Sequence, residues 1–214
     1  MVRSCTAREL PYAFWGRVMK FVSFYTPNGK YPELAKKLQA SLDKFELASD
    51  IELVQDFGTW QKSNAYKPQF LLKMMQRHRC PVVWLDIDTE VWQYPELLFG
   101  PHDFAVYNWA QDTNHHLDKR LNPTKMTCAG GVIKFGITHG AISLLIRWDR
   151  RMLESTKADD QELDALYNEH ADVNPLWLPK TYNRMDKHTS HWRNIPTDTV
   201  VINHDYTGGK YRNL

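Results

Sequence analysis

The chain has 214 residues, of which 43% are hydrophobic, 24% are charged and 13% are aromatic, and its formal net charge is +2 at pH 7. This composition predicts a single globular domain over residues 1–214, long enough to bury a full core, and it excludes a disordered chain. The apolar runs are too short for a membrane span, and the polar start lacks a secretory signal, so we expect a cytoplasmic protein. The small positive charge neither marks nor excludes a nucleic-acid-binding protein.

Strands and helices alternate along the first half of the chain. Residues 20–26 form a β-rich run that ends at a Pro-Asn-Gly turn, and Pro32 then suits the first turn of a helix with one apolar face. A second strand over residues 50–56 precedes a helix over 68–79. The apolar run Pro81–Leu85 follows and is typical of a central strand covered on both faces. This order predicts right-handed crossovers and a mostly parallel sheet.

The second half continues the α/β pattern. Five more elements are expected, namely strands over residues 104–108, 131–135 and 199–203, a helix over 139–153 and a helix that begins near Asp159. The polar, irregular region 112–127 is predicted to be a loop near a functional site. The three cysteines, Cys5, Cys80 and Cys128, have no metal-site spacing and are expected to be reduced thiols.

Two carboxylates, Asp86 and Asp88, directly follow the most apolar strand. In an open α/β sheet, ligands bind outside the carboxyl ends of the strands. Two like charges placed there repel each other unless a cation lies between them, and carboxylate oxygens suit Mg²⁺ or Mn²⁺. A calcium loop is disfavoured, because Val91 and Leu97 stand where it needs Gly and Glu. A solvated turn stays open as the structural alternative.

The segment around Asp159 has both a structural and a functional interpretation. Asp159 with Glu162 three residues later predicts a capping box at the start of a helix, and Asp160 would then project into a cleft. The small residues 129–131 predict either a tight turn before a strand or a place where the backbone touches a ligand.

The end of the chain carries a second set of polar groups. His204 would add an imidazole to the two aspartates, a mixed set of ligands that suits Mn²⁺. Gly209 lets the backbone approach an anion, and Lys210 offers a point charge for phosphate. A frayed polar terminus is the alternative.

In their order along the chain, these patterns resemble the GT-A glycosyltransferases, and more narrowly the retaining, glycogenin-like nucleotide-diphospho-sugar transferases. The shared features are the opening strand FVSFYT, the lysine-bearing segment YKPQF, the run VVWLDIDTEVWQYPELL, the small-residue segment CAGG, the pair Asp160-Gln161, and His204 with Lys210 six residues on. The resemblance covers about Lys20 to Arg212 and implies a Rossmann-like GT-A domain. The closing segment departs from the family, which usually has Lys-Pro-Trp where this chain has Lys210-Tyr211-Arg212.

The resemblance also implies roles for individual residues. Asp88 and His204 would bind Mn²⁺ or Mg²⁺, and Asp86 would contact the sugar or ribose and the cation. The remaining implied roles are catalysis at the reacting sugar for Asp160 and Gln161, nucleotide-sugar binding for Phe24, Tyr25, Thr26, Lys67, Gly209 and Lys210, and sugar or acceptor contacts for Ala129, Gly130 and Gly131.

The implied activity is metal-dependent transfer of a sugar, with retention, from a nucleotide-diphosphate sugar to an acceptor hydroxyl. The acceptor classes are a glycan, a protein, a small metabolite or a modified base of bacteriophage DNA, and the small size suits a bacterial or phage enzyme. Basic stretches at 77–79 and 188–193 keep nucleic acid open, with a solvated face as the alternative. One rival is a phosphatase of the haloacid-dehalogenase type, whose motif wants Thr or Val where Glu90 stands. The other is a nucleotide-sugar-binding protein without turnover.

Overall fold

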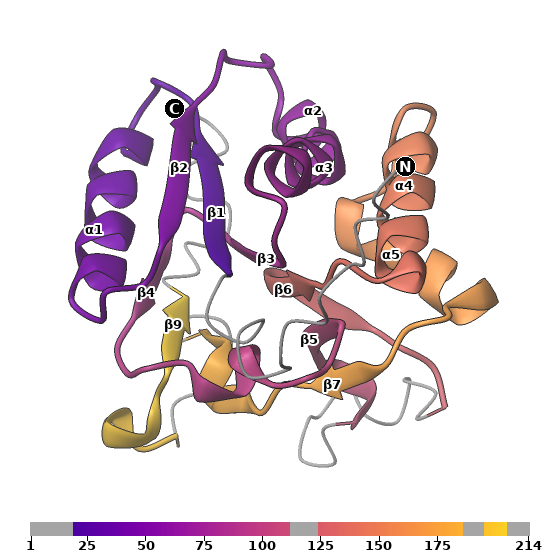
Figure 1. Cartoon of the computed structure of the whole chain (residues 1–214). Helices are drawn as coiled ribbons and strands as arrows, with labels where there is room; N and C mark the ends of the chain where they lie inside the picture. Colours follow the sequence, from indigo (N-terminus) through magenta and orange to yellow (C-terminus); the bar gives the residue numbers. More distant parts are fainter. Residues whose placement is uncertain (1–18, 112–123, 186–194, 205–214) are drawn as a thin grey trace, which may run out of the picture.

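The computed structural model describes residues 19–111, 124–185 and 195–204 (Figure 1). These residues form an α/β domain around a six-stranded sheet with the strand order β2-β1-β3-β6-β5-β7. Its strands are β1 (Lys20–Tyr25), β2 (Ser49–Leu53), β3 (Val82–Leu85), β5 (Phe104–Asn108), β6 (Cys128–Phe135) and β7 (Pro175–Trp177). In this sheet, β6 runs antiparallel to β3 and β5, and the other strands share one direction. The predicted, mostly parallel sheet is confirmed.

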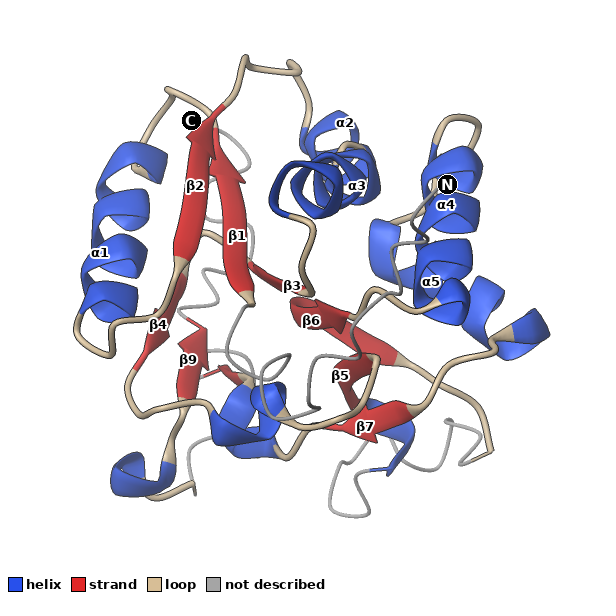
Figure 2. Cartoon of the chain, in the orientation of Figure 1, coloured by secondary structure: helices blue, strands red, loops and turns tan. Residues whose placement is uncertain are grey.

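Helices cover both faces of this sheet (Figure 2). Helix α1 (Tyr31–Asp43) has a proline in its first turn and buries Leu34, Leu38 and Leu42 against one face. The other face is covered by α3 (Lys67–His78), α4 (His139–Met152) and α5 (Asp159–His170), with the short helix α2 (Trp60–Ala65) before α3. No helix among the described residues is long and apolar enough to cross a membrane.

A smaller sheet stands beside the carboxyl end of β3 and has the order β4-β9-β8. It consists of β4 (Thr89–Val91), β9 (Ile202–His204) and β8 (Arg184–Met185). Strand β9 pairs antiparallel with β4 and parallel with β8. The last strand therefore begins later than predicted, because Thr197–Thr199 forms a 3₁₀ turn after Pro196. Further 3₁₀ segments in the described part of the chain are Glu96–Phe99, Trp109–Gln111 and Lys180–Tyr182.

Strand β3 lies at the centre of the core, as its apolar sequence predicts. All four of its residues are buried, and their side chains alternate between the two apolar layers. Val82 and Trp84 pack with α3 and α4, whereas Val83 and Leu85 pack on the α1 side. Cys80 and Cys128 are buried free thiols. Cys5 and most of the predicted loop 112–127 lie outside the described residues.

Candidate functional site

A tight turn places Asp86 and Asp88 at the carboxyl end of β3. The backbone N–H of Thr89 donates to the carbonyl oxygen of Asp86 at 3.0 Å, and the Thr89 hydroxyl donates to the same oxygen at 2.8 Å. The N–H of Asp86 donates to the carbonyl of Gly131 at 2.9 Å, which ties the turn to β6. Since the turn leads directly into β4, both carboxylates stay where the main sheet meets the smaller one.

His204 reaches the two carboxylates from the smaller sheet. It ends β9 opposite Thr89 of β4 and is 5% exposed. Its Nε2 lies 2.9 Å from Oδ1 of Asp88 and 3.7 Å from Oδ2 of Asp86. One potential ligand atom from each of the three residues lies within 4.8 Å of the other two. Two carboxylates and an imidazole at this spacing can share one divalent cation.

The charges of this cluster shift the pKa values of His204 and Asp86. Burial would lower the pKa of His204, but Asp88 and Asp86 outweigh burial and raise that pKa above its ordinary value. Burial would raise the pKa of Asp86, yet Lys67 and His204 hold it below its ordinary value. The cluster therefore favours a protonated imidazole between carboxylates, and a cation that binds Nε2 must displace that proton.

Lys67 forms the opposite side of the site. It opens α3, is 4% exposed, and its Nζ lies 2.6 Å from Oδ2 of Asp159 and 3.3 Å from Oδ1 of Asp86. It also donates to the carbonyl of Gly130 at 3.3 Å and lies 5.0 Å from the centroid of the Trp84 ring. Burial would lower the pKa of Lys67, but Asp159 and Asp86 raise it above its ordinary value. This buried cation stays charged and compensates two carboxylates.

The predicted capping box at the start of α5 is wrong. The N-cap residue is Ala158 and makes no side-chain capping bond. The carboxylate of Asp159 pairs with Lys67 instead, and Glu162 accepts a 2.6 Å hydrogen bond from the Ser155 hydroxyl. Leaving one charge of a buried ion pair without its partner costs about 3–5 kcal/mol, whereas losing a capping bond costs about 1 kcal/mol.

Acidic side chains of α5 continue the site along β6. Asp160 is half-buried and accepts the backbone N–H of the exposed Gln161 at 2.8 Å, while burial and the neighbouring Asp159 raise its pKa. One turn later, Asp164 accepts the N–H of Cys128 at 2.8 Å, and burial raises its pKa to about 7. Asp164 was not predicted from the sequence as a site residue, although its spacing of four residues from Asp160 places both on one helix face.

The small residues before the predicted strand lie inside β6, which begins at Cys128. The interpretation of residues 129–131 as a turn is therefore wrong, because Ala129 already pairs with Tyr107 of β5. Gly130 and Gly131 border the site from opposite faces of the strand. A Cβ on Gly130 would lie 3.5 Å from both Asp160 and Lys67. On Gly131 it would lie 2.7 Å from Nδ1 of His204, so the imidazole needs a glycine there.

Three of the residues expected to bind the nucleotide sugar lie at the end of β1. Tyr25 is half-buried, and Thr26 is buried at the carboxyl end of the strand. The ring of Phe24 packs into the core against Tyr66 and Trp84, with centroids 5.3 and 5.2 Å away. Gly209 and Lys210 lie outside the described residues.

Two residues of the predicted basic stretch 77–79 pair with carboxylates of β2. Arg77 forms ion pairs with Asp50 and Glu52, and Nε2 of His78 lies 2.7 Å from Asp50. The second stretch, 188–193, lies outside the described residues.

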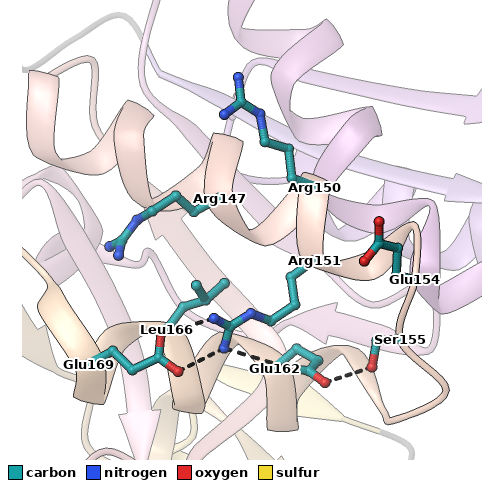
Figure 3. A pocket seen from close by; sticks show the side chains of 8 residues that line it. All are labelled: Arg147, Arg150, Arg151, Glu154, Ser155, Glu162, Leu166 and Glu169. Atoms are coloured by element: carbon teal, nitrogen blue, oxygen red, sulfur yellow. Dashed lines mark hydrogen bonds and ion pairs between the residues drawn. The ribbon is translucent and has the colours of Figure 1, made fainter.

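A separate pocket lies between α4 and α5 (Figure 3). The α4 residues Arg147, Arg150 and Arg151 line it. Arg151 makes two 2.9 Å hydrogen bonds to Glu169 across the pocket. None of its lining residues belongs to the cluster around Asp86. Arg151 also forms an ion pair with Glu162, and the pocket is not part of the site.

No protein-family model matches this chain. No curated protein matches it either. Among solved structures, the chain is similar to a glycosyltransferase involved in the glycosylation of the major capsid of PBCV-1, with 10% identity, a TM-score of 0.62, and coverage of 88% of this chain and 93% of that chain. It also matches the galactosyltransferase LgtC in complex with donor and acceptor sugar analogs, at 13% identity over 87% of this chain and 86% of that one, but the TM-score of 0.49 is too low for a conclusion. The first similarity, together with the strand order, shows the GT-A glycosyltransferase fold that the sequence predicts.

Proposed function

We propose that the chain is a metal-dependent glycosyltransferase that moves a sugar from a nucleotide-diphosphate sugar to an acceptor hydroxyl, with retention. The observation that carries this proposal is the convergence of Asp86, Asp88 and His204 at the carboxyl end of β3. The GT-A fold contains an open α/β sheet, and in such sheets ligands bind outside the carboxyl ends of the strands. The same fold favours a transferase over the phosphatase alternative.

The three clustered side chains fit a divalent cation. Carboxylates suit Mn²⁺ and Mg²⁺ alike, and the imidazole favours Mn²⁺. Asp88 and His204 would hold the cation, and Asp86 would contact the cation and the sugar or ribose. When bound, the cation neutralises charge on the diphosphate leaving group.

The side chains around the cluster have complementary tasks. Lys67 keeps Asp86 and Asp159 in place, since it pairs with both. Asp160 borders the same space over Gly130 and would stabilise positive charge on the sugar ring or orient the acceptor hydroxyl. Opposite unit charges 4 Å apart are worth about 4 kcal/mol at an effective dielectric constant near 20, so one such carboxylate supplies several hundredfold in rate.

The remaining assignments follow the resemblance. Tyr25 and Thr26 would contact the nucleotide, with Gly209 and Lys210 at its diphosphate. Gln161 would lie at the reacting sugar, and Ala129 and Gly130 at the sugar or acceptor.

We propose a hydroxyl of a glycan as the first acceptor class to test. The similar glycosyltransferase is described as involved in the glycosylation of a viral major capsid. The ion pairs of Arg77 with Asp50 and Glu52 disfavour nucleic acid at that stretch, because the charge of this arginine is already compensated. A base of phage DNA remains the second acceptor to include.

The decisive experiment is a thermal-shift screen of nucleotide sugars with and without Mn²⁺, followed by detection of released nucleoside diphosphate. The donor should stabilise the wild-type protein only when Mn²⁺ is present. Asp88→Ala should keep the fold but lose this Mn²⁺-dependent thermal shift. Glu90→Gln is the matched control, because this carboxyl lies two residues away and faces Trp92. A full Mn²⁺-dependent shift in Asp88→Ala would falsify the metal assignment. Binding without turnover on any acceptor or water would point to the non-catalytic alternative.

The stereochemical outcome needs its own measurement. An NMR spectrum of the product, recorded early in turnover, should show the anomeric configuration of the donor. The opposite configuration would contradict retention and leave sugar transfer intact.

A further inference from the structure

Asn183 is a fully buried amide beside the imidazole of His204, and the proposed chemistry does not use it. Its exposed fraction is 0%, and in the described part of the chain neither Oδ1 nor Nδ2 has a hydrogen-bond partner. Buried amides nearly always have partners, because removing such a group from water without compensation is unfavourable. An amide without a partner next to a cation site therefore indicates a bond that forms in another state of the site.

The backbone around Asn183 is well fixed. The residue follows the 3₁₀ segment Lys180–Tyr182, and its N–H donates to the carbonyl of Lys180 at 3.0 Å. It directly precedes β8, which pairs with the strand that carries His204. Asn183 is thus anchored to the element that positions the imidazole.

Gly131 shows how the amide and the imidazole are related. A Cβ on Gly131 would lie 2.7 Å from Nδ1 of His204 and 3.0 Å from Oδ1 of Asn183. Both atoms therefore border the same small gap above the glycine. The other ring nitrogen, Nε2, faces Asp88 on the opposite side of the ring.

We propose that Asn183 is a positioning residue: its Oδ1 accepts a hydrogen bond from Nδ1–H of His204 when Nε2 of that ring binds the divalent cation. This inference rests on the proposed function. The second ring nitrogen of a metal-binding histidine usually donates to an acceptor, which fixes the tautomer and the orientation of the ring. Since its side chain is fully buried, Asn183 acts through His204 and not by touching the substrate.

The test compares Asn183→Leu, which removes the acceptor at similar volume, with Asn183→Asp, which keeps an oxygen in the same place. Mn²⁺ affinity is measured from the free-ion electron paramagnetic resonance signal, and unfolding is followed in EDTA. We expect Asn183→Leu to bind Mn²⁺ about 10- to 100-fold more weakly and to keep the wild-type unfolding midpoint in EDTA. Asn183→Asp should bind with wild-type affinity or better.

Three results would overturn the inference. They are wild-type affinity in Asn183→Leu, an equal loss in both variants, or an imidazole of His204 protonated on Nε2 in the nitrogen NMR spectrum of the Mg²⁺-saturated wild-type protein. The spectrum decides even where Asn183→Leu fails to fold, because it uses the unmodified chain. A wild-type protein that binds no Mn²⁺ contradicts the proposed metal dependence and this inference together, whereas an unchanged Asn183→Leu contradicts this inference alone.

Discussion

Replacing Gly131 by alanine should weaken cation binding, although it replaces none of the proposed ligands. The new methyl group would lie 2.7 Å from Nδ1 and 2.9 Å from Cε1 of His204. Carbon atoms pack at about 3.5 Å or more, so the ring must retreat by roughly 0.8 Å. Metal–ligand distances tolerate only about 0.2 Å, and the cost of a misplaced ligand is on the order of 10- to 100-fold in affinity. That loss corresponds to about 1.4–2.8 kcal/mol.

The neighbouring glycine provides the matched control. A Cβ on Gly130 would have its nearest neighbours at 3.5 Å, which is ordinary contact, and it lies on the other face of β6. Gly130→Ala should therefore bind Mn²⁺ with nearly wild-type affinity. Both variants are titrated with Mn²⁺ under the same conditions, and urea unfolding in EDTA reports any general damage, for which overpacking predicts about 1–3 kcal/mol in Gly131→Ala. Equal Mn²⁺ affinities in the two variants would refute the steric reasoning.

Three further predictions test the charges. Lys67→Met should destabilise the fold by about 3–5 kcal/mol in urea unfolding, because it leaves Asp159 buried and unpaired. The control Lys73→Met removes an exposed ion pair and should cost about 1 kcal/mol or less. Similar losses in both variants would contradict the assignment of a buried ion pair. Burial lowers the pKa of Lys134 to about 8. Above that pH the unfolded chain therefore binds more protons at this lysine than the folded chain does. The free energy of unfolding should rise by up to about 3 kcal/mol from pH 8 to 10.5. Lys134→Met should lack this rise, and parallel pH profiles would contradict the assignment. Burial raises the pKa of Asp164 to about 7, so stability should fall between pH 4 and 7 in the wild type relative to Asp164→Asn; a wild type that gains stability over that range relative to the variant would contradict it.

Elements whose signal is local could be predicted from the sequence. The apolar run that ends at Leu85 is a buried central strand, and the helical spacing of Leu34, Leu38 and Leu42 gives the buried face of α1. Both signals come from burial that repeats within a few residues. Strands β4 and β8, with three and two residues, are too short to show a period, and neither was predicted.

Details that depend on partners far along the chain could not be predicted. Asp159 has the spacing of a helix cap, but its carboxylate is taken by Lys67 from another helix. The reversed direction of β6 depends on which strands it joins, and no local pattern encodes that choice. Asn183 carries no motif, and only the packing of three strands places it beside His204.

The carboxylate of Asp86 connects Lys67 on one side of the site with His204 on the other. Its Oδ1 receives Lys67 at 3.3 Å and the indole N–H of Trp84 at 2.6 Å, and its Oδ2 faces His204 at 3.7 Å. One oxygen is therefore compensated by the main sheet and its helices, and the other lies toward the smaller sheet. Because Lys67 already stabilises the charged form from one side, the carboxylate stays ionised whether or not a cation binds on the other. In the function that we propose, the lysine would thus leave the second oxygen of Asp86 to the divalent ion.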